Sequence, residues 1–306
     1  MTTPPARTLT VVDPGMLTTV QDDGRAGYAH LGVPRSGWLD PVSAGLANRL
    51  VGNPPDAAVL ECLLGGLALE AGSAVTVAVT GAACTVWIQG RGDGRHAAHG
   101  SAVSVAAGQR VVLGRVTRGA RCYVAVSGGI AVPPVLGSRS TDTLSGLGPP
   151  RLTVGTVLPV GPVRGAPSDA SAVARDPGEP AALRIRRGPR TDWFTGDALG
   201  RLCTAAYVVA PDSNRVALRL RGPTLSRTVP GELPSEGLVL GAVQVPADGQ
   251  PVVFLRDHPT TGGYPVVAVV ELGDLDRCAQ LLAGDAVTFR QPHPHAATGG
   301  GRDRRR

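Results

Sequence analysis

Short apolar runs separated by Gly- and Pro-rich segments dominate the pattern of this chain. Many of these runs alternate apolar with polar residues or string together β-branched residues, and both patterns predict β-strands. The 42 Gly and 27 Pro residues supply turns between the runs. We expect strands at residues 74–80, 85–89, 103–106, 111–113, 122–126, 183–187, 216–220, 252–255, 266–271 and 286–289.

Helical signals are few and short. The clearest helix has Asp40 as N-cap and Pro41 at its first position, and it ends at Gly52. A second is expected at 197–205, and a third begins with Asp274 as its cap and runs through Leu281. The pattern therefore predicts a mostly β protein with isolated helices, built from closed barrels or sandwiches. An apolar strand such as 266–270 would carry an association risk if it lay at a barrel edge.

A change in composition divides the chain. Residues 161–180 concentrate Pro with Gly, Ser, Ala and Asp, which indicates a linker or an exposed loop. We therefore expect an N-terminal domain at 1–165, a linker or loop at 166–180 and a C-terminal domain at 181–290. Residues 291–306 read as a disordered basic tail, and the four Arg and one Asp of 302–306 supply +3 of the net charge of +6.

Composition also excludes several chemistries. All 30 basic residues are Arg, so this polypeptide has no P-loop lysine, no Schiff-base lysine and no covalent biotin. Any ATP or biotin chemistry must draw those groups from another polypeptide. Aromatic residues make up 3% of the chain and do not interleave with a basic stripe, which argues against nucleic-acid binding.

The chain also lacks membrane and secretion signals. No apolar run approaches the ~20 residues that span a bilayer, and residues 1–10 lack the apolar segment of a signal peptide. The 5 cysteines are widely spaced and mostly flanked by apolar residues, as in reduced core thiols. We expect a cytoplasmic protein.

The strongest local candidate for chemistry is the loop 257–265, which reads Asp-His-Pro-Thr-Thr-Gly-Gly-Tyr-Pro after an apolar strand. Its glycines allow positive φ and close backbone approach, and polar loops at strand ends often carry function. A polar surface turn is the plainer interpretation. Glu236, Gln244 and Asp257 are candidates to converge on one site, where two carboxylates can divide acid and base roles. A solvated turn is an equal alternative for Glu236.

Three further polar segments are candidates for substrate binding. Gln21, Asp22 and Arg25 follow an apolar run, and Asp22 and Arg25 could hold an amide-like substrate or pair with each other. Arg139 lies beside Ser140 and Asp142, and it could bind a carboxylate or phosphate or form an internal clamp with Asp142. The same choice applies to Arg215.

Metal sites have little support. His96 and His99 are spaced as HxxH within 91–100, but that segment reads as a polar, solvated loop. His293 and His295 fall in the tail. We expect no metal on this chain.

Several motifs in order resemble one family. They are the segment 14–22 with Gly24–Tyr28, Gly32–Pro34 and Ser36-Gly37, followed by 46–53, 137–142, 244–246 and 260–265. Together they resemble the 5-oxoprolinase C-subunit family, also described as allophanate hydrolase subunit 2 or biotin-dependent carboxyltransferase, which includes the regulator KipA. The resemblance covers residues 9–289.

The resemblance implies two cyclophilin-like β-barrel domains. It also implies a hetero-oligomer with a B-subunit-like protein, and with the A-subunit for full activity. That complex uses ATP, with Mg²⁺ taken to accompany it, to open the lactam of 5-oxoproline to glutamate, and this chain is expected to be inactive alone. Two departures bear on substrate identity: His258-Pro259 replaces a usual Gln, and 214–217 read Asn-Arg-Val-Ala instead of Asp-Arg-Met-Gly.

Within this hypothesis, Asp257 and Glu236 are the acid–base candidates. The expected substrate-binding residues are Gln21, Asp22, Arg25, Arg139, Ser140, Asp142, Arg215, Gln244, Thr260, Thr261, Gly262, Gly263 and Tyr264. Two alternatives stay open. One is the carboxyltransferase component of a biotin-dependent urea or amide carboxylase with its carrier on another chain. The other is a KipA-like, non-catalytic regulator that binds a kinase inhibitor resembling the B-subunit.

Overall fold

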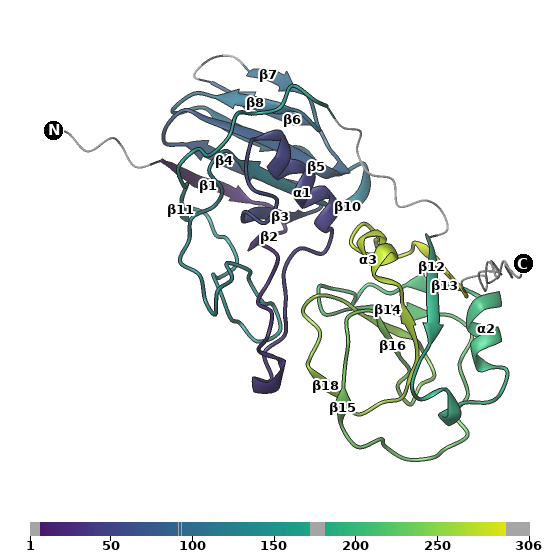
Figure 1. The fold of residues 1–306 in the computed structure, drawn as a ribbon. Helices are drawn as coiled ribbons and strands as arrows, with labels where there is room; N and C mark the ends of the chain where they lie inside the picture. Colours follow the sequence, from purple (N-terminus) through teal and green to yellow (C-terminus); the bar gives the residue numbers. More distant parts are fainter. Residues whose placement is uncertain (1–6, 91, 93, 172–180, 292–306) are drawn as a thin grey trace, which may run out of the picture.

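The computed structural model describes residues 7–90, 92, 94–171 and 181–291, and it consists mainly of β-strands (Figure 1). Two sheets lie within residues 8–159, and a closed barrel lies within 181–290. The prediction of a mostly β fold with a few short helices is confirmed. The proposed domain bounds stay a prediction, and residues 172–180 of the linker and 292–306 of the tail lie outside the described residues.

The first sheet has six strands. Their order is β11 (Val157–Pro159), β1 (Thr8–Pro14), β4 (Leu67–Ala71), β9 (Arg110–Leu113), β6 (Val86–Gln89) and β7 (Gly94–Ala97). The second sheet has five, in the order β2 (Leu17–Gln21), β3 (Val59–Leu63), β10 (Arg118–Val126), β5 (Val75–Ala83) and β8 (Ala102–Val105). All strand pairs in both sheets are antiparallel.

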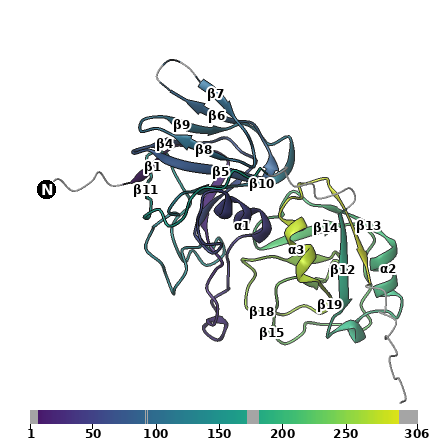
Figure 2. The same cartoon turned by 45° about the horizontal axis from the view of Figure 1, so that its top comes forward.

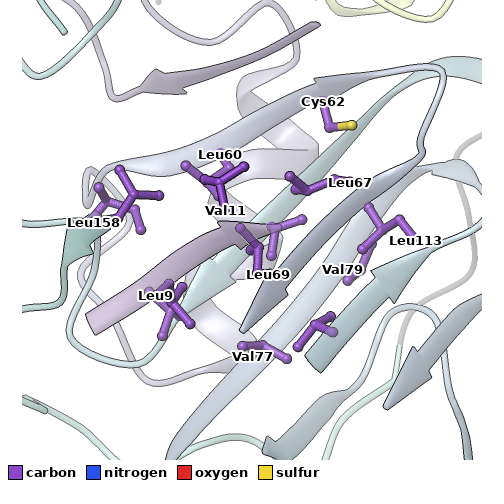
Figure 3. Packing of buried hydrophobic residues seen from close by; sticks show 14 of the residues in the cluster. Leu9, Val11, Leu60, Cys62, Leu67, Leu69, Val77, Val79, Leu113 and Leu158 are labelled. Carbon is purple, nitrogen blue, oxygen red and sulfur yellow. The ribbon is translucent and has the colours of Figure 1, made fainter. Parts of the chain in front are cut away.

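Alternate residues of these two sheets form one apolar core between them. Leu9 and Val11 of β1 point toward Leu60 of β3 and Val77 and Val79 of β5, as Figure 3 shows. All five side chains are at most 2% exposed. Because successive side chains of a strand face opposite sides, the alternating sequence fixes which face each sheet buries.

The second half is a closed barrel. Its strands follow the order β12 (Ala181–Arg187), β19 (Val266–Val270), β16 (Ala242–Gln244), β17 (Val252–Phe254), β14 (Ala217–Arg221), β13 (Ala206–Val209) and β20 (Ala286–Arg290). The parallel pair β12–β20 closes the ring. Closure leaves no unpaired strand edge in the ring, so the association risk of Val266–Val270 as an edge strand does not arise. A separate ribbon pairs β15 (Glu236–Gly237) with β18 (Thr261–Gly262).

Two of the three helices in the described chain match their predicted positions. Helix α1 (Pro41–Leu50) is capped by Asp40, whose carboxylate accepts a 2.9 Å hydrogen bond from Ser43 N. Helix α2 (Ala198–Thr204) lies within the predicted range.

Helix α3 (Leu272–Cys278) begins before its predicted cap, because Glu271 occupies the N-cap position. Asp274 instead lies in the first turn, where its carboxylate accepts hydrogen bonds from Arg184 N and Nε of strand β12. A long-range ion pair, which local sequence does not reveal, therefore replaces the expected capping role.

Every predicted strand has a counterpart, but several observed strands were missed, including β1, β2, β3 and β4. The segment 91–100 is also not simply a loop, because β7 pairs with β6 and sets the His96 ring 3.8 Å from the Trp87 ring. Short strands of this kind are stabilised by their neighbours rather than by their own composition.

The two halves meet at a polar seam. Gln280, just after α3, accepts hydrogen bonds from Ala120 N and Arg121 N and donates to Asp40 at the start of α1. Both cartoon views set α3 between the barrel and α1 (Figures 1 and 2). No helix among the described residues is long and apolar enough to cross a membrane.

Candidate active site and the ion-pair network

The ribbon β15–β18 brings together several of the predicted site residues. Glu236 lies opposite Gly262, and Gly237 lies opposite Thr261. Leu238 N extends the pairing by donating to Thr260 O at 2.9 Å. The loop after the β17 strand and the segment that contains Glu236 are therefore one structural unit (Figure 1).

Gln244 supports this unit from the barrel wall. The Gln244 Nε2 atom donates to Tyr264 O at 2.7 Å. A Cβ on Gly262 would lie 2.9 Å from this Gln244 Nε2 atom. Gly262 thus needs its lack of a side chain for close approach. Positive φ is not the reason: neither Gly262 nor Gly263 adopts it, so that part of the expectation is wrong.

A cavity of about 840 Å³ opens beside Tyr264, between residues 224–232 and 247–249. Arg227 lies at this cavity with its guanidinium 5.6 Å from the centre of the Tyr264 ring, a cation–π distance. Its Nη2 donates to Val245 O, while its Nε is buried without a hydrogen-bond partner among the described residues. Arg227 was not a candidate from sequence.

Glu236 is held by an arginine that the sequence also did not identify. Arg190 Nε donates to Glu236 Oε2 at 3.0 Å, and Arg190 Nη2 donates to Oε1. These hydrogen bonds lower the pKa of Glu236 below its usual range. Glu236 is therefore ionised at neutral pH, the form that accepts rather than supplies a proton.

Asp257 belongs to the same loop, but its side chain bonds to Ser36, Thr143 and Arg215 rather than to the β15–β18 ribbon. Its carboxylate is completely buried. Oδ1 accepts from Ser36 Oγ at 2.7 Å and Arg215 Nη2 at 3.0 Å. Oδ2 accepts from Thr143 N, Thr143 Oγ1 and Arg215 Nε at 2.9, 2.7 and 3.0 Å.

Arg215 extends the network into the N-terminal sheets. Its Nη1 donates to Glu61 Oε1 and its Nη2 donates to Gly37 O at 2.7 Å. Glu61 also lies 3.5 Å from Arg121 Nε and accepts from Tyr123 OH at 3.0 Å. We call Asp257, Arg215, Glu61 and Arg121 the ion-pair network; it joins the barrel half to the sheet half.

Charge compensation keeps Asp257 and Arg215 ionised. Burial alone raises the pKa of Asp257, but attraction and hydrogen bonds from Arg215 and hydrogen bonds from Thr143 outweigh it, so the pKa lies below its usual range. Burial likewise lowers the pKa of Arg215, but Asp257 and Glu61 more than offset it and the pKa is raised.

The N-terminal polar segments form a third cluster, centred on Asp22. Its carboxylate accepts from Gly24 N, Ser138 Oγ, Arg139 N and Ser140 Oγ at 2.9, 2.5, 2.5 and 2.7 Å. Asp22 therefore ties two loops together.

Neither of the internal pairings considered from sequence forms. Asp22 makes no ion pair with Arg25, whose Nη2 donates to Ser140 O. Arg139 Nε donates to Val132 O at 2.7 Å, while Asp142 accepts from Leu144 N at 2.9 Å in a local turn. Arg139 lines a polar cleft beside residues 128–131.

Two candidate residues of this cluster carry buried polar atoms without a partner among the described residues: Gln21 Oε1 and Arg25 Nη1. Arg25 is 2% exposed, and the described residues place no carboxylate within ion-pair distance of it. Buried charges are ordinarily paired. Arg25 is an exception among the described residues, because it is buried without a carboxylate partner.

The network and the Asp22 cluster are connected. Ser36 Oγ, which reaches Asp257, also lies 3.1 Å from Thr141 O, and Gln21 Nε2 donates to the same carbonyl at 2.9 Å. The structure thus groups the candidates in two sets: Glu236, Gln244 and Thr260–Tyr264 around the ribbon, and the remainder around Asp22 and the ion-pair network.

Four residues of these clusters were missed from sequence: Arg190, Arg227, Glu61 and Arg121. Glu61 and Arg121 each interrupt an apolar strand, and a lone charge at such a position signals a buried ionic partner. Arg190 and Arg227 lie in polar segments, where nothing local distinguishes them from solvated arginines.

The comparisons with known proteins converge on one group. Residues 31–291 match the family model "Carboxyltransferase domain, subdomain A and B". The chain is 38% identical over 286 residues to the 5-oxoprolinase C-subunit of Escherichia coli (strain K12). The aligned region covers 92% of this chain and 91% of that protein.

Solved structures give the same relation. The crystal structure of TTHA0988 superposes with a TM-score of 0.83 at 35% identity, and the match covers 95% of this chain and 57% of that one. The K. lactis urea amidolyase superposes with a TM-score of 0.86 at 28% identity, over 96% of this chain and 19% of that one.

Proposed function

This chain belongs to the carboxyltransferase domain family (subdomains A and B), and from that premise we propose that it is the C-subunit of an ATP-dependent 5-oxoprolinase. The reaction opens the lactam of 5-oxoproline to glutamate. The observation that carries the proposal is the near end-to-end match, 91% of its length, to a protein named as the C-subunit of 5-oxoprolinase.

The cavity beside Tyr264 suits a small anionic amide. Arg227 lines its wall together with Glu232 and Asp248, and its Nε has no hydrogen-bond partner among the described residues. Asp248 lies 3.6 Å from Arg221. A substrate carboxylate at Arg227 would gain charge-assisted hydrogen bonds. The guanidinium carbon of Arg227 lies 5.6 Å from the centre of the Tyr264 ring.

Glu236 is the proton-accepting group of this proposal. Its pairing with Arg190 keeps it ionised, and its strand lies against Gly262, two residues before Tyr264. Asp257 has both carboxylate oxygens engaged, so the arrangement supports a positioning role: it fixes the start of the 257–265 loop through Arg215. Its acid–base role stays a prediction.

We propose that ATP and Mg²⁺ are held outside this chain. The sequence has no Lys, and the described residues contain no group of three His, Cys, Asp or Glu able to hold a metal ion. We assign the nucleotide to partners that resemble the A- and B-subunits, and we expect the isolated chain to be folded but inactive.

The test is reconstitution. The chain is purified alone and with A- and B-subunit-like partners, and 5-oxoproline-dependent formation of ADP and glutamate is measured. We expect turnover only in the complex, together with co-elution on size-exclusion chromatography with light scattering. Turnover by the isolated chain, or no turnover with all partners bound, contradicts the proposal.

A substitution tests the cavity within that complex. Arg227→Gln is expected to raise KM for 5-oxoproline about ten- to hundredfold, since a charged hydrogen bond contributes about 1.5–3 kcal/mol. Arg219→Gln is the matched control, because Arg219 forms an exposed pair with Asp212 on the outer surface. If the two substitutions raise KM equally, Arg227 does not bind the substrate.

The second candidate function is the carboxyltransferase component of a biotin-dependent urea or amide carboxylase. The observation in its favour is the similarity to the K. lactis urea amidolyase. Because this chain has no Lys, the biotin carrier must be another chain. Carboxylation of urea with such a carrier, in the absence of 5-oxoproline turnover, would favour this function.

A further inference from the structure

Three of the free cysteines lie close together in the sheet half. Cys62 of β3 and Cys122 of β10 are cross-strand partners, and Cys84 occupies the short connection between β5 and β6. Cys62 and Cys122 are 0% exposed, whereas Cys84 is half-buried. The view of the core shows Cys62 at the edge of the apolar cluster (Figure 3).

Cys84 and Cys122 are in direct contact. The Cys122 thiol donates to Cys84 Sγ over 3.5 Å. A disulfide needs about 2.05 Å, so side-chain rotation and a small backbone adjustment must supply the remaining approach. Cys84 can adjust because it follows the end of β5 and lies outside any strand. The β5–β10 ladder is also irregular between Arg118 and Cys122.

The two thiols differ in reactivity. The hydrogen bond from Cys122 lowers the pKa of Cys84, with burial acting in the opposite direction. The same hydrogen bond and burial raise the pKa of Cys122. The more accessible sulfur is thus also the one that ionises more readily, and the thiolate is the nucleophile in thiol oxidation.

Cys62 is not the partner in this pair. Its thiol donates to Gly65 O at 3.4 Å, and burial raises its pKa. Cys122 Sγ lies 3.5 Å from Cys84 Sγ and also 3.5 Å from Ala82 O, so Cys122 is the thiol in contact with Cys84.

We propose that Cys84 is an oxidation site for hydroperoxides and that the oxidised sulfur is captured by Cys122 as an intramolecular disulfide. The Cys84 thiolate attacks a peroxide oxygen, so an S–O bond forms and the O–O bond breaks. Hydroxide or an alkoxide leaves, takes up the proton that the Cys84 thiol released on ionising, and departs as water or an alcohol. The sulfur loses two electrons to the peroxide and becomes a sulfenic acid.

Cys122 completes the reaction. Its sulfur attacks Cys84 Sγ, so the S–S bond forms and the S–O bond breaks. The leaving hydroxide takes the Cys122 proton and departs as water. A dithiol reductant returns both cysteines to thiols and is itself oxidised to a disulfide.

The test treats the full chain with hydrogen peroxide, blocks the remaining thiols with N-ethylmaleimide under denaturing conditions and measures intact mass and linked peptides. We expect two of the 5 thiols to be lost, with one cross-linked peptide joining Cys84 to Cys122. Dithiothreitol should restore both thiols. A Cys84 sulfinic acid without a cross-link, or a cross-link between other cysteines, overturns the proposal.

Variants sharpen the assignment. Cys84→Ser should abolish the loss of thiols, and Cys122→Ser should leave a Cys84 sulfenic acid that dimedone traps. Cys203→Ser is the matched control, because Cys203 is a half-buried thiol of the barrel half whose pKa burial raises; it should leave the cross-link unchanged. If Cys122→Ser fails to fold, the peptide map of the unmodified chain still decides. Peroxide-dependent loss of two thiols in Cys84→Ser would refute the inference.

Discussion

At the scale of single residues, the hydrogen bonds of Asp257 define what its carboxylate contributes. Both oxygens accept hydrogen bonds from groups on three separate segments, around Ser36, Thr143 and Arg215. A carboxylate so enclosed fixes the geometry of those segments. The fixed loop then presents Tyr264 to the cavity.

Asp257→Asn is expected to destabilise the fold by about 3–5 kcal/mol, because it leaves Arg215 buried beside an uncharged amide. Asp212→Asn is the control. It removes a carboxylate of similar type from the exposed pair with Arg219, which should cost less than about 1 kcal/mol. Urea unfolding measures both, and equal losses would show that the network is not stabilising.

The same residue gives a pH dependence. The pKa of Asp257 in the folded protein lies below its usual value, which is about 3.9 when unfolded. Its stabilisation is therefore complete above about pH 4 and is lost as the pH falls through the folded-state value. The free energy of unfolding of the unmodified protein should fall more steeply below pH 4 than that of Asp257→Asn. Parallel acid profiles would contradict this.

At the scale of elements, the β15–β18 ribbon sets the shape of the candidate site. Gly262 lies against Gln244 and Leu238, and a Cβ there would lie 2.7 Å from Leu238 Cδ1. Its neighbour in the ribbon, Gly237, has no atom within 4 Å of the corresponding position. The two glycines therefore form a matched pair for substitution.

Gly262→Ala is expected to destabilise the protein by about 1–3 kcal/mol, as overpacking does, and to raise KM by displacing the Gln244 contact with Tyr264. Gly237→Ala should change stability by less than about 0.5 kcal/mol. Thermal unfolding and reconstituted turnover are the measurements. If both variants behave alike, close packing at Gly262 does not shape the site.

At the scale of the whole molecule, Gln280 joins the two halves. Its side chain makes hydrogen bonds to Ala120 N, Arg121 N, Arg121 O and Asp40 across the seam. Gln250 offers a control, because its amide bonds only to the backbone of Gly222 in its own half.

Gln280→Ala is expected to cost about 1–3 kcal/mol for each buried group left unpaired, and to broaden the calorimetric unfolding transition, because the halves are then coupled by the ion-pair network without the Gln280 bonds. Gln250→Ala should keep a single transition and lose less than about 1 kcal/mol, because water can replace its bonds. A single sharp transition in Gln280→Ala would show that the halves are coupled by other contacts.

The sequence by itself determined the elements whose signals are local. Alternation of apolar residues predicted the strand around Val77, a continuous apolar run predicted the strand around Val253, and the capping chemistry of Asp40 predicted α1. Gly262 and Tyr264 were identified as site candidates because their motif is contiguous. These local patterns predict the structure correctly because each depends on residues close in sequence or on which face of a strand is buried.

The tertiary structure alone decided which charges meet. Arg215 pairs with Asp257 and with Glu61, 154 positions away in the chain, Arg190 pairs with Glu236, and Asp274 pairs with Arg184 rather than capping a helix. The sequence around a charged residue does not identify a partner that is distant in the chain. The partner is determined by which charges are buried together, because an unpaired buried charge strongly destabilises the fold. The placement of Asp257 in the network, rather than beside Glu236, follows from that cost.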